Sequence, residues 1–322
     1  MVYYSYQKET ERDMEIRITQ DMAGKTVRDL LRTELRLSVK MLKYLKYRNA
    51  GICVNGERCT VRRVLVCGDV LTLETEDREA SEALLPVDLP IDVLYEDEDL
   101  VVPAKPAQMP THPSHDHYDD TVANALAFRY EQKGVPFVFR PINRLDRNTS
   151  GLLLVARNKI AAGALTQAMQ AGLIRKSYLA ILDGEMRERC GEIDLCLHRT
   201  RDSIIVREAC PPSTPDADAA QTLYTVLASQ NGHTLVCAKP ITGRTHQLRV
   251  HFAALGHPIT GDDLYGTPSP LIARHALHAW QLTFPHPATG EAMTLTAPLP
   301  QDLRVPMETL FPEFVLERKE CL

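Results

Sequence analysis

The N-terminal part of the chain shows an apolar pattern that changes from helical to strand-like spacing. Apolar side chains recur every three or four positions after Thr26 and again after Ser38, and both residue types favour helix N-caps. A strand over 52–54, an Asn-Gly turn, a partner strand over 59–61 and a further strand over 70–73 follow. We therefore predict a small domain over residues 14–75, made of two helices and a hairpin.

The rest of the chain predicts a second, larger domain. Residues 76–90 are acidic and aperiodic, which is typical of a linker. Strand-like runs follow at 91–95, 100–102, 178–182, 221–228 and 234–238, and helical spacing appears at 159–171 and 246–255. Because strands outnumber helices and short turns join them, we expect an α+β fold with a largely antiparallel mixed sheet over 91–305. Residues 306–322 would form a C-terminal tail.

Composition is ordinary for a globular protein, with 322 residues, 44% hydrophobic and 25% charged. The chain has no apolar leader and no run of about 20 apolar residues, so we expect a cytoplasmic protein without a membrane segment. No two cysteines are separated by only two residues, which argues against a zinc knuckle. The pattern around the histidines predicts a polar loop: His112, His115 and His117. We therefore expect no metal, and the absence of a glycine-rich phosphate loop argues against a nucleotide cofactor.

The net charge of −5 hides a strong asymmetry. Between residues 12 and 63 there are 13 basic and 6 acidic residues, whereas residues 69–99 are dominated by acids. A local positive field attracts a polyanion even when the whole chain is acidic. The second predicted helix concentrates this charge, which makes its basic residues candidate RNA contacts: Lys40, Lys43, Lys46 and Arg48.

One polar run stands out in the larger domain, Asn143-Arg144-Leu145-Asp146-Arg147-Asn148-Thr149-Ser150-Gly151, before the apolar residues 152–156. Arginines beside an acid favour its ionised form, and an ionised, positioned carboxylate can act as a nucleophile or a base. Taken alone, the same run fits a surface turn with a solvated ion pair equally well.

Three further runs decide between these interpretations: Arg175-Lys176-Ser177-Tyr178-Leu179-Ala180, then 242–251 with the sequence TGRTHQLRVH, then Gly256-His257-Pro258-Ile259 with Gly261-Asp262 behind it. In this order the set resembles the pseudouridine synthases of the RluA/RluD type. The resemblance covers about residues 91–303, and the small domain resembles the S-four-type (alpha-L) RNA-binding motif. Many members of the family have His where this chain has Asn143.

The resemblance implies that the enzyme detaches uracil from ribose in RNA, turns it and rejoins it through carbon 5. It implies that Asp146 acts at the sugar, either by attacking the anomeric carbon or by removing a neighbouring proton. Tyr178 would stack on uracil and assist the late proton transfer, and Arg249 would pair with Asp146. Because the target base must leave its helix, Arg144 would enter the vacated space.

The same motifs contribute further candidates for contacts with RNA or substrate: Arg147, Thr149, Arg244, His246, Gln247 and Leu248. Arg244 would position the loop or a phosphate, Leu248 would pack under the tyrosine, and His246 also fits a purely structural role. The expected partner is a structured ribosomal RNA, most naturally of the large subunit, or a transfer RNA. No cofactor is needed, and we expect a monomer.

Two other functions stay open at this point. A non-catalytic RNA-binding or ribosome-assembly factor could use the basic domain alone. A nucleoside or glycoside hydrolase would need a second carboxylate across the scissile bond, and the motifs supply only Asp146. The uridine that is modified, and the choice between one site and several, are not encoded in these patterns.

Overall fold

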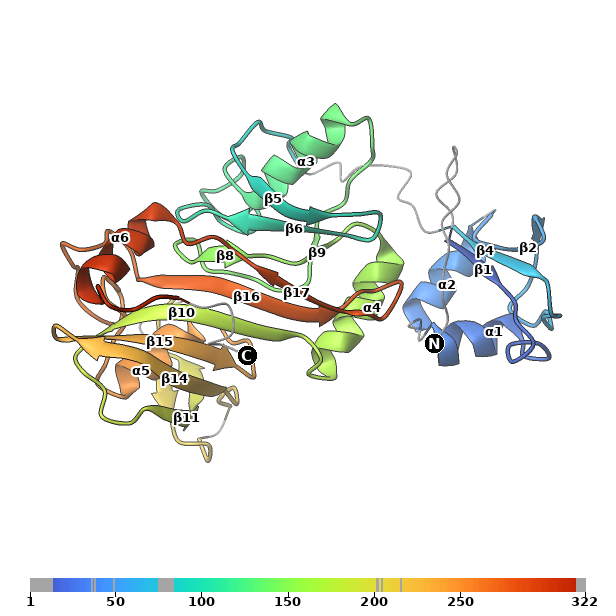
Figure 1. Cartoon of the computed structure of the whole chain (residues 1–322). Coiled ribbons are helices and arrows are strands. Elements are labelled where there is room, and N and C mark those ends of the chain that lie inside the picture. Colours follow the sequence, from blue (N-terminus) through green and yellow to red (C-terminus); the bar gives the residue numbers. More distant parts are fainter. Residues whose placement is uncertain are drawn as a thin grey trace.

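The structure is a computed structural model, and it describes residues 14–74 and 84–316, apart from 36, 38, 49, 201, 202, 204 and 215. The expected N-cap Ser38, the first part of the predicted linker and the end of the predicted tail lie outside the described residues, as does the side chain of Lys40. Figure 1 shows a small N-terminal unit beside a larger body that is built around one long, curved sheet.

The N-terminal unit contains the expected helices and one strand that we did not predict, and the second strand of its hairpin lies at 57–58 instead of 59–61. Its strands β1 (Met14–Arg17), β2 (Ile52–Val54), β3 (Glu57–Arg58) and β4 (Val70–Leu73) form an antiparallel sheet in the order β1-β4-β2-β3. The first predicted helix is split into α1 (Val27–Asp29) and a π-helical turn η1 (Leu30–Glu34), and the second is α2 (Val39–Tyr47). As predicted, Thr26 caps the first helix, and its hydroxyl accepts from the amide of Asp29.

The N-terminal unit contacts the larger body through helix α4 (Lys159–Gln170). The side chain of Ile160 is 5% exposed and belongs to the apolar core of the N-terminal unit. The amine of Lys159 lies 3.9 Å from the ring centroid of Tyr44 on α2, a cation–π contact.

The larger body confirms the expected mixed fold with a largely antiparallel sheet. Its main path is β11-β14-β15-β10-β16-β8-β6-β9-β7, with β17 added beside β16 and β5 beside β6. Its described pairs are antiparallel except β16 with β8. The strands are β5 (Asp92–Glu96), β6 (Leu100–Lys105), β7 (Arg140–Pro141), β8 (Ser150–Leu152), β9 (Val155–Ala156), β10 (Arg175–Asp183), β11 (Cys190–Asp194), β14 (Gln221–Gln230), β15 (His233–Pro240), β16 (Leu277–Pro285) and β17 (Ala292–Thr296). A separate ribbon pairs β12 (Cys196–Arg199) with β13 (Arg207–Cys210).

The five predicted strand runs of this body correspond to β5, β6, β10, β14 and β15. The predicted helices correspond to α4 and α5 (Gln247–Ala254), and Gly172 and Gly256 follow them with positive φ angles. We missed α3 (Val122–Gln132), α6 (Gln301–Leu310) and the central strand β16. No helix of the described residues is long and apolar enough to span a membrane.

Both predicted boundaries of the larger domain need correction. The boundary after residue 305 falls inside α6, whose Met307 and Leu310 are buried in the main core, because an apolar helix face must be covered. At the other end, Leu84 and Leu89 of the predicted linker pack against the core under α3, and the side-chain amide of Asn124 donates to the carbonyl of Leu85.

The sheet positions the polar run around Asp146 between β7 and β8, in the middle of the body. Strand β8 pairs with β16 on one side and β6 on the other. This close approach requires glycine at 151, where φ is +115° and an added Cβ would lie 2.2 Å from the carbonyl oxygen of Ala279.

We therefore expect Gly151→Ala to lower the free energy of unfolding by about 3 kcal/mol or more, because both the φ angle and the clash oppose it. Gly163→Ala is the matched control, since an added Cβ inside α4 meets no atom within 4 Å. The control should gain about 0.5–1 kcal/mol. Urea denaturation of both variants measures their free energies of unfolding. Equal values would mean that position 151 does not require glycine.

Candidate active site

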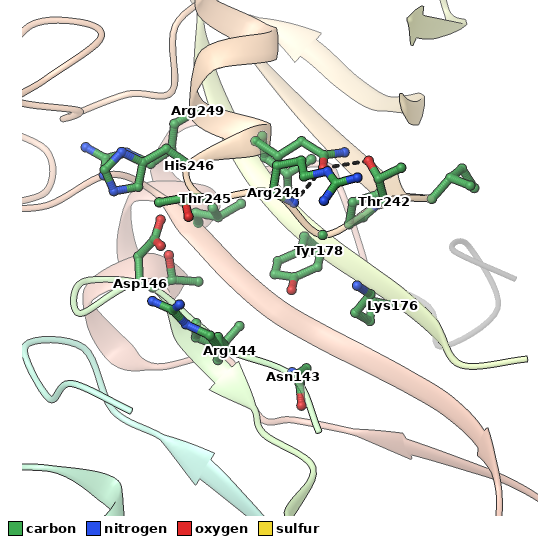
Figure 2. Close-up of a pocket in the computed structure, with 18 of the residues that line it drawn as sticks. Asn143, Arg144, Asp146, Lys176, Tyr178, Thr242, Arg244, Thr245, His246 and Arg249 are labelled. Atoms are coloured by element: carbon green, nitrogen blue, oxygen red, sulfur yellow. Dashed lines mark hydrogen bonds between the residues drawn. The ribbon is translucent and has the colours of Figure 1, made fainter. Parts of the chain in front are cut away.

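Three segments that are distant in sequence form most of the wall of a cavity of about 580 Å³, and Met169, Gln170 and Leu277 complete it. The three segments are the loop after β7, the strand β10 and the connection from β15 into α5 (Figure 2). The cavity brings together most of the predicted site residues: Asp146, Tyr178, Arg249, Arg144, Thr149, Arg244, His246, Gln247 and Leu248. Arg147 does not line it, and its guanidinium donates instead to the carbonyl of Gln108.

Buried groups fix the backbone of the loop that carries Asp146. Leu145 is 7% exposed in the main core, and its carbonyl accepts a hydrogen bond from the hydroxyl of Thr111 at 3.0 Å. The amide of Thr149 closes the turn on the carbonyl of Asp146. The Asp146 side chain therefore stands on a fixed support, half-buried at the cavity wall.

Lys105, at the end of β6, is the main anchor of this loop and was missed by the sequence analysis. Its amine is 1% exposed and donates to the carbonyls of Pro106, Met109 and Arg147 at 2.7–2.8 Å. Burial, with the charge of Arg274, lowers the pKa of Lys105 to about 7, while the charge of Asp146 acts in the opposite sense. A lysine that ends a buried apolar strand is the signal that could have identified it.

Arg274 anchors the far end of the loop and was missed as well. Its guanidinium is 4% exposed and donates to the carbonyl of Asn148 at 3.0 Å and to the hydroxyl of Ser150 at 3.2 Å. Its other donors meet Asp302 on α6, at 2.7 and 3.1 Å. Arg274 therefore links the Asp146 loop to α6, the helix that contains the predicted domain boundary.

Tyr178 projects from β10 into the centre of the cavity (Figure 2). It is 7% exposed and shares an apolar cluster with Leu145 and Leu248. Burial, and then the charge of Asp146, raise the pKa of the Tyr178 phenol, so the hydroxyl is protonated at neutral pH. The ring can stack on a base while the hydroxyl donates a hydrogen bond.

The predicted direct ion pair between Arg249 and Asp146 is corrected by the structure. Arg249 is 4% exposed, and its fork meets Asp262 at 2.6 and 2.7 Å. Burial opposes ionisation of Asp262, but the hydrogen bonds and charge of Arg249 outweigh it and lower the pKa of Asp262. The competing carboxylate sits in the Gly261-Asp262 run, 13 residues further along the chain. Arg249 still lines the cavity, and, against the opposing effect of burial, the charge of Asp146 is among the causes that raise the pKa of Arg249, after the hydrogen bonds and charge of Asp262.

Gln247 and His246 shape the loop at the start of α5. Gln247 uses both amide groups inside the protein: its carbonyl accepts from Thr242 and the amide of Arg244, and its NH₂ donates to Gln221 and Thr222. His246 adopts φ +58°, a conformation that is rare outside glycine and concentrated at functional sites. Its ring nitrogen lies 2.8 Å from the hydroxyl of Tyr265.

The other predicted contacts divide into exposed and buried groups. Arg144 is exposed and lines the cavity, whereas Thr149 is buried and its hydroxyl meets His275 at 2.9 Å. Arg244 donates to the carbonyl of Ala219 at the cavity edge. Among the described residues there is no group of three or more His, Cys, Asp or Glu that could hold a metal ion.

Comparisons with known proteins agree on one family. The family model described as RNA pseudouridylate synthase matches residues 99–254. An uncharacterized RNA pseudouridine synthase of Bacillus subtilis, YjbO, is 40% identical over 84% of this chain and 94% of its own length. Ribosomal large subunit pseudouridine synthase C of Vibrio vulnificus is 32% identical over 91% and 95% of the two chains. The solved structure of human RNA pseudouridylate synthase domain containing 1 matches with a TM-score of 0.56 and 30% identity, over 66% of this chain and 84% of that chain.

The buried pair of Arg249 and Asp262 yields a stability prediction. Asp262→Ala leaves the Arg249 cation without its buried partner, which should cost about 3–5 kcal/mol of unfolding free energy. Asp263→Ala is the control, because that side chain is 70% exposed and lies 3.4 Å from the same guanidinium. It should cost less than about 1 kcal/mol. Chemical denaturation compares the two variants, and similar losses would mean that Asp262 does not hold Arg249.

Proposed function

The chain belongs to the RNA pseudouridine synthase family, and from this premise we propose which residues carry the reaction and which RNA it acts on. The protein is an enzyme that isomerises uridine in RNA to pseudouridine. Of the described residues that line the cavity, Asp146 alone carries a carboxylate. This observation supports an isomerase over a hydrolase, which uses two carboxylates across the scissile bond.

We propose that Asp146 carries out the reaction step at the ribose. Attack on the anomeric carbon and removal of a neighbouring proton both require an ionised carboxylate beside the bound ribose. Arg249, which also lines the cavity, is held in place by its hydrogen bonds to Asp262. Tyr178 would hold the base by stacking, and its protonated phenol would donate to it. Arg144, exposed at the rim, would fill the space that the flipped nucleotide leaves.

The proposed substrate is ribosomal RNA of the large subunit. Ribosomal large subunit pseudouridine synthase C of Vibrio vulnificus matches nearly the full length of this chain, which supports ribosomal RNA over transfer RNA as the substrate. We also propose that the protein acts in the cytoplasm, as a monomer. Pseudouridine mapping of all RNAs, in cells with and without this protein, tests the assignment, and lost sites confined to transfer RNA would overturn it.

Asp146→Asn should slow pseudouridine formation by about 1,000-fold or more, because it removes the reacting charge with little change in shape. The measurement is tritium release from carbon 5 of uridine, in total RNA labelled in cells that lack this protein. RNA affinity and the melting temperature should change little. Asp263→Asn is the matched control and should keep the wild-type rate. A rate for Asp146→Asn within tenfold of wild type would remove this residue from the chemistry.

We propose that the N-terminal unit is an S-four-type RNA-binding domain that uses the exposed face of α2. Lys43 and Lys46 are exposed there, and Tyr47 beside them is 78% exposed, so phosphate contacts and base stacking are both available. Arg48 fits this role less well than predicted, because its guanidinium pairs with Glu74 at 2.6 Å and lies over the ring of Tyr44.

Replacing both Lys43 and Lys46 with Gln should weaken RNA binding and reduce the slope of log affinity against log salt by about 2. The single-turnover rate at saturating RNA should stay unchanged, since neither residue lines the cavity. Arg304→Gln on α6, at the opposite end of the molecule in Figure 1, is the control. An unchanged salt slope in the double variant would place the RNA elsewhere.

A further inference from the structure

Lys176 occupies the cavity without a role in the assignments above. It precedes Tyr178 by two residues on β10, so both side chains lie on the same face of the strand. Both line the cavity, and Figure 2 shows Tyr178 between Asp146 on one side and Lys176 on the other. The order across the cavity is therefore carboxylate, aromatic ring, amine.

Lys176 is half-buried in the cavity wall, and its amine differs from the buried cations of the site. Lys105 is satisfied by three carbonyls and Arg249 by Asp262, but no carboxylate among the described residues pairs with Lys176. Burial lowers the pKa of Lys176, which is the sign of a desolvated cation without a compensating charge. Desolvated charges in proteins are normally paired, so a bound molecule is the natural partner.

The wall opposite the amine is bare backbone. Gly243 lies there, and a Cβ added to it would come within 3.5 Å of the Lys176 nitrogen. A side chain at 243 would therefore occupy the space next to the amine. The glycine leaves that position next to the amine without a side chain.

A uridine placed by these groups brings one particular atom to Lys176. With the sugar at Asp146 and the base flat on Tyr178, the far vertex of the ring points to the amine. That vertex is carbon 4, opposite the nitrogen that joins the sugar, and it carries the carbonyl oxygen O4. We infer that Lys176 is a catalytic and specificity-determining residue, whose ammonium donates a hydrogen bond to the carbonyl at the far vertex of uracil. This inference rests on the proposed function.

The contact fits each stage of the isomerisation. When the bond between the anomeric carbon and N1 breaks, its electron pair stays with uracil, and the negative charge is shared between O2 and O4. The ammonium stabilises that charge. After the base turns, carbon 5 bonds to the anomeric carbon and releases its proton, and N1 takes up a proton. The vertex opposite carbon 5 is carbon 2, so O2 then replaces O4 at Lys176.

The same contact would distinguish uracil from cytosine. Cytosine carries an amino group at carbon 4, which would place two donors face to face. A site built around a buried donor strongly rejects a ligand that leaves this donor without an acceptor.

Lys176→Met tests the inference, because it keeps the stem and removes the ammonium. In the tritium-release assay on total RNA from cells that lack this protein, its single-turnover rate should fall by about 100-fold. RNA affinity, the salt slope and the melting temperature should not fall, since the amine has no carboxylate partner among the described residues that the variant would lose. Lys176→Arg should recover part of the rate. Arg175→Gln, which removes a charge from the exposed face of the same strand, is the control and should match the wild type.

Each other outcome overturns the inference in a recognisable way. A salt slope reduced by about 1 with an unchanged rate would mean that the amine binds a phosphate. A lower melting temperature, with a rate loss that Lys176→Arg does not relieve, would mean a structural role. An unchanged rate and slope would mean that the amine faces water. If the wild type releases no tritium, or Asp146→Asn releases it as fast, the proposed function fails and this inference fails with it.

Discussion

The buried ammonium of Lys105 holds together the stretches of chain that position Asp146, the proposed catalytic carboxylate. It sits at the end of a central strand and binds carbonyls of its own segment and of the Asp146 loop. Moving that loop would leave a desolvated cation without an acceptor, which is far more costly than losing an exposed hydrogen bond. The position of Asp146 is therefore set by the sheet, and the loop inherits the rigidity of β6 and, through Arg274, of α6.

The cations of the site divide by whether the protein satisfies them. Lys105, Arg249 and Arg274 are hydrogen-bonded to carbonyls or carboxylates of the protein, so they build the framework and contribute a fixed positive field. Arg144 at the rim and Lys176 inside the cavity have no such carboxylate partner among the described residues. Because one carboxylate faces several cations, the cavity favours an anionic ligand or an anionic intermediate. This asymmetry suits a reaction in which the base departs with an electron pair.

Helix α4 links the N-terminal unit to the cavity. In its first turn, Lys159 contacts the ring of Tyr44 and Ile160 packs in the core of the N-terminal unit. At its other end, Met169 lines the cavity. A helix of 12 residues spans about 18 Å. An RNA bound along α2 would therefore lie a short and defined distance from the reacting groups.

Local sequence was sufficient for the strands with strong apolar runs, for the helices that end in glycine and for the loop that carries Asp146. It failed where context decides. Helix α6 has buried apolar residues at helical spacing, but Pro306 inside it argues locally against a helix, and only the core that it covers makes the helix stable. Strand β16 was missed although it lies at the centre of the sheet, because a run buried on both faces lacks the alternation that marks an exposed strand.

The sequence by itself determined the family and most of the residues that line the cavity, because these residue types and their order occur in short contiguous runs. The tertiary structure decided the pairings. Arg249 binds Asp262 instead of Asp146, Lys105 supports the loop from a strand some 40 residues earlier, and Lys176 is left without a carboxylate. Ion pairs depend on distance and on exclusion of water, and both are properties of the folded chain that no local pattern contains.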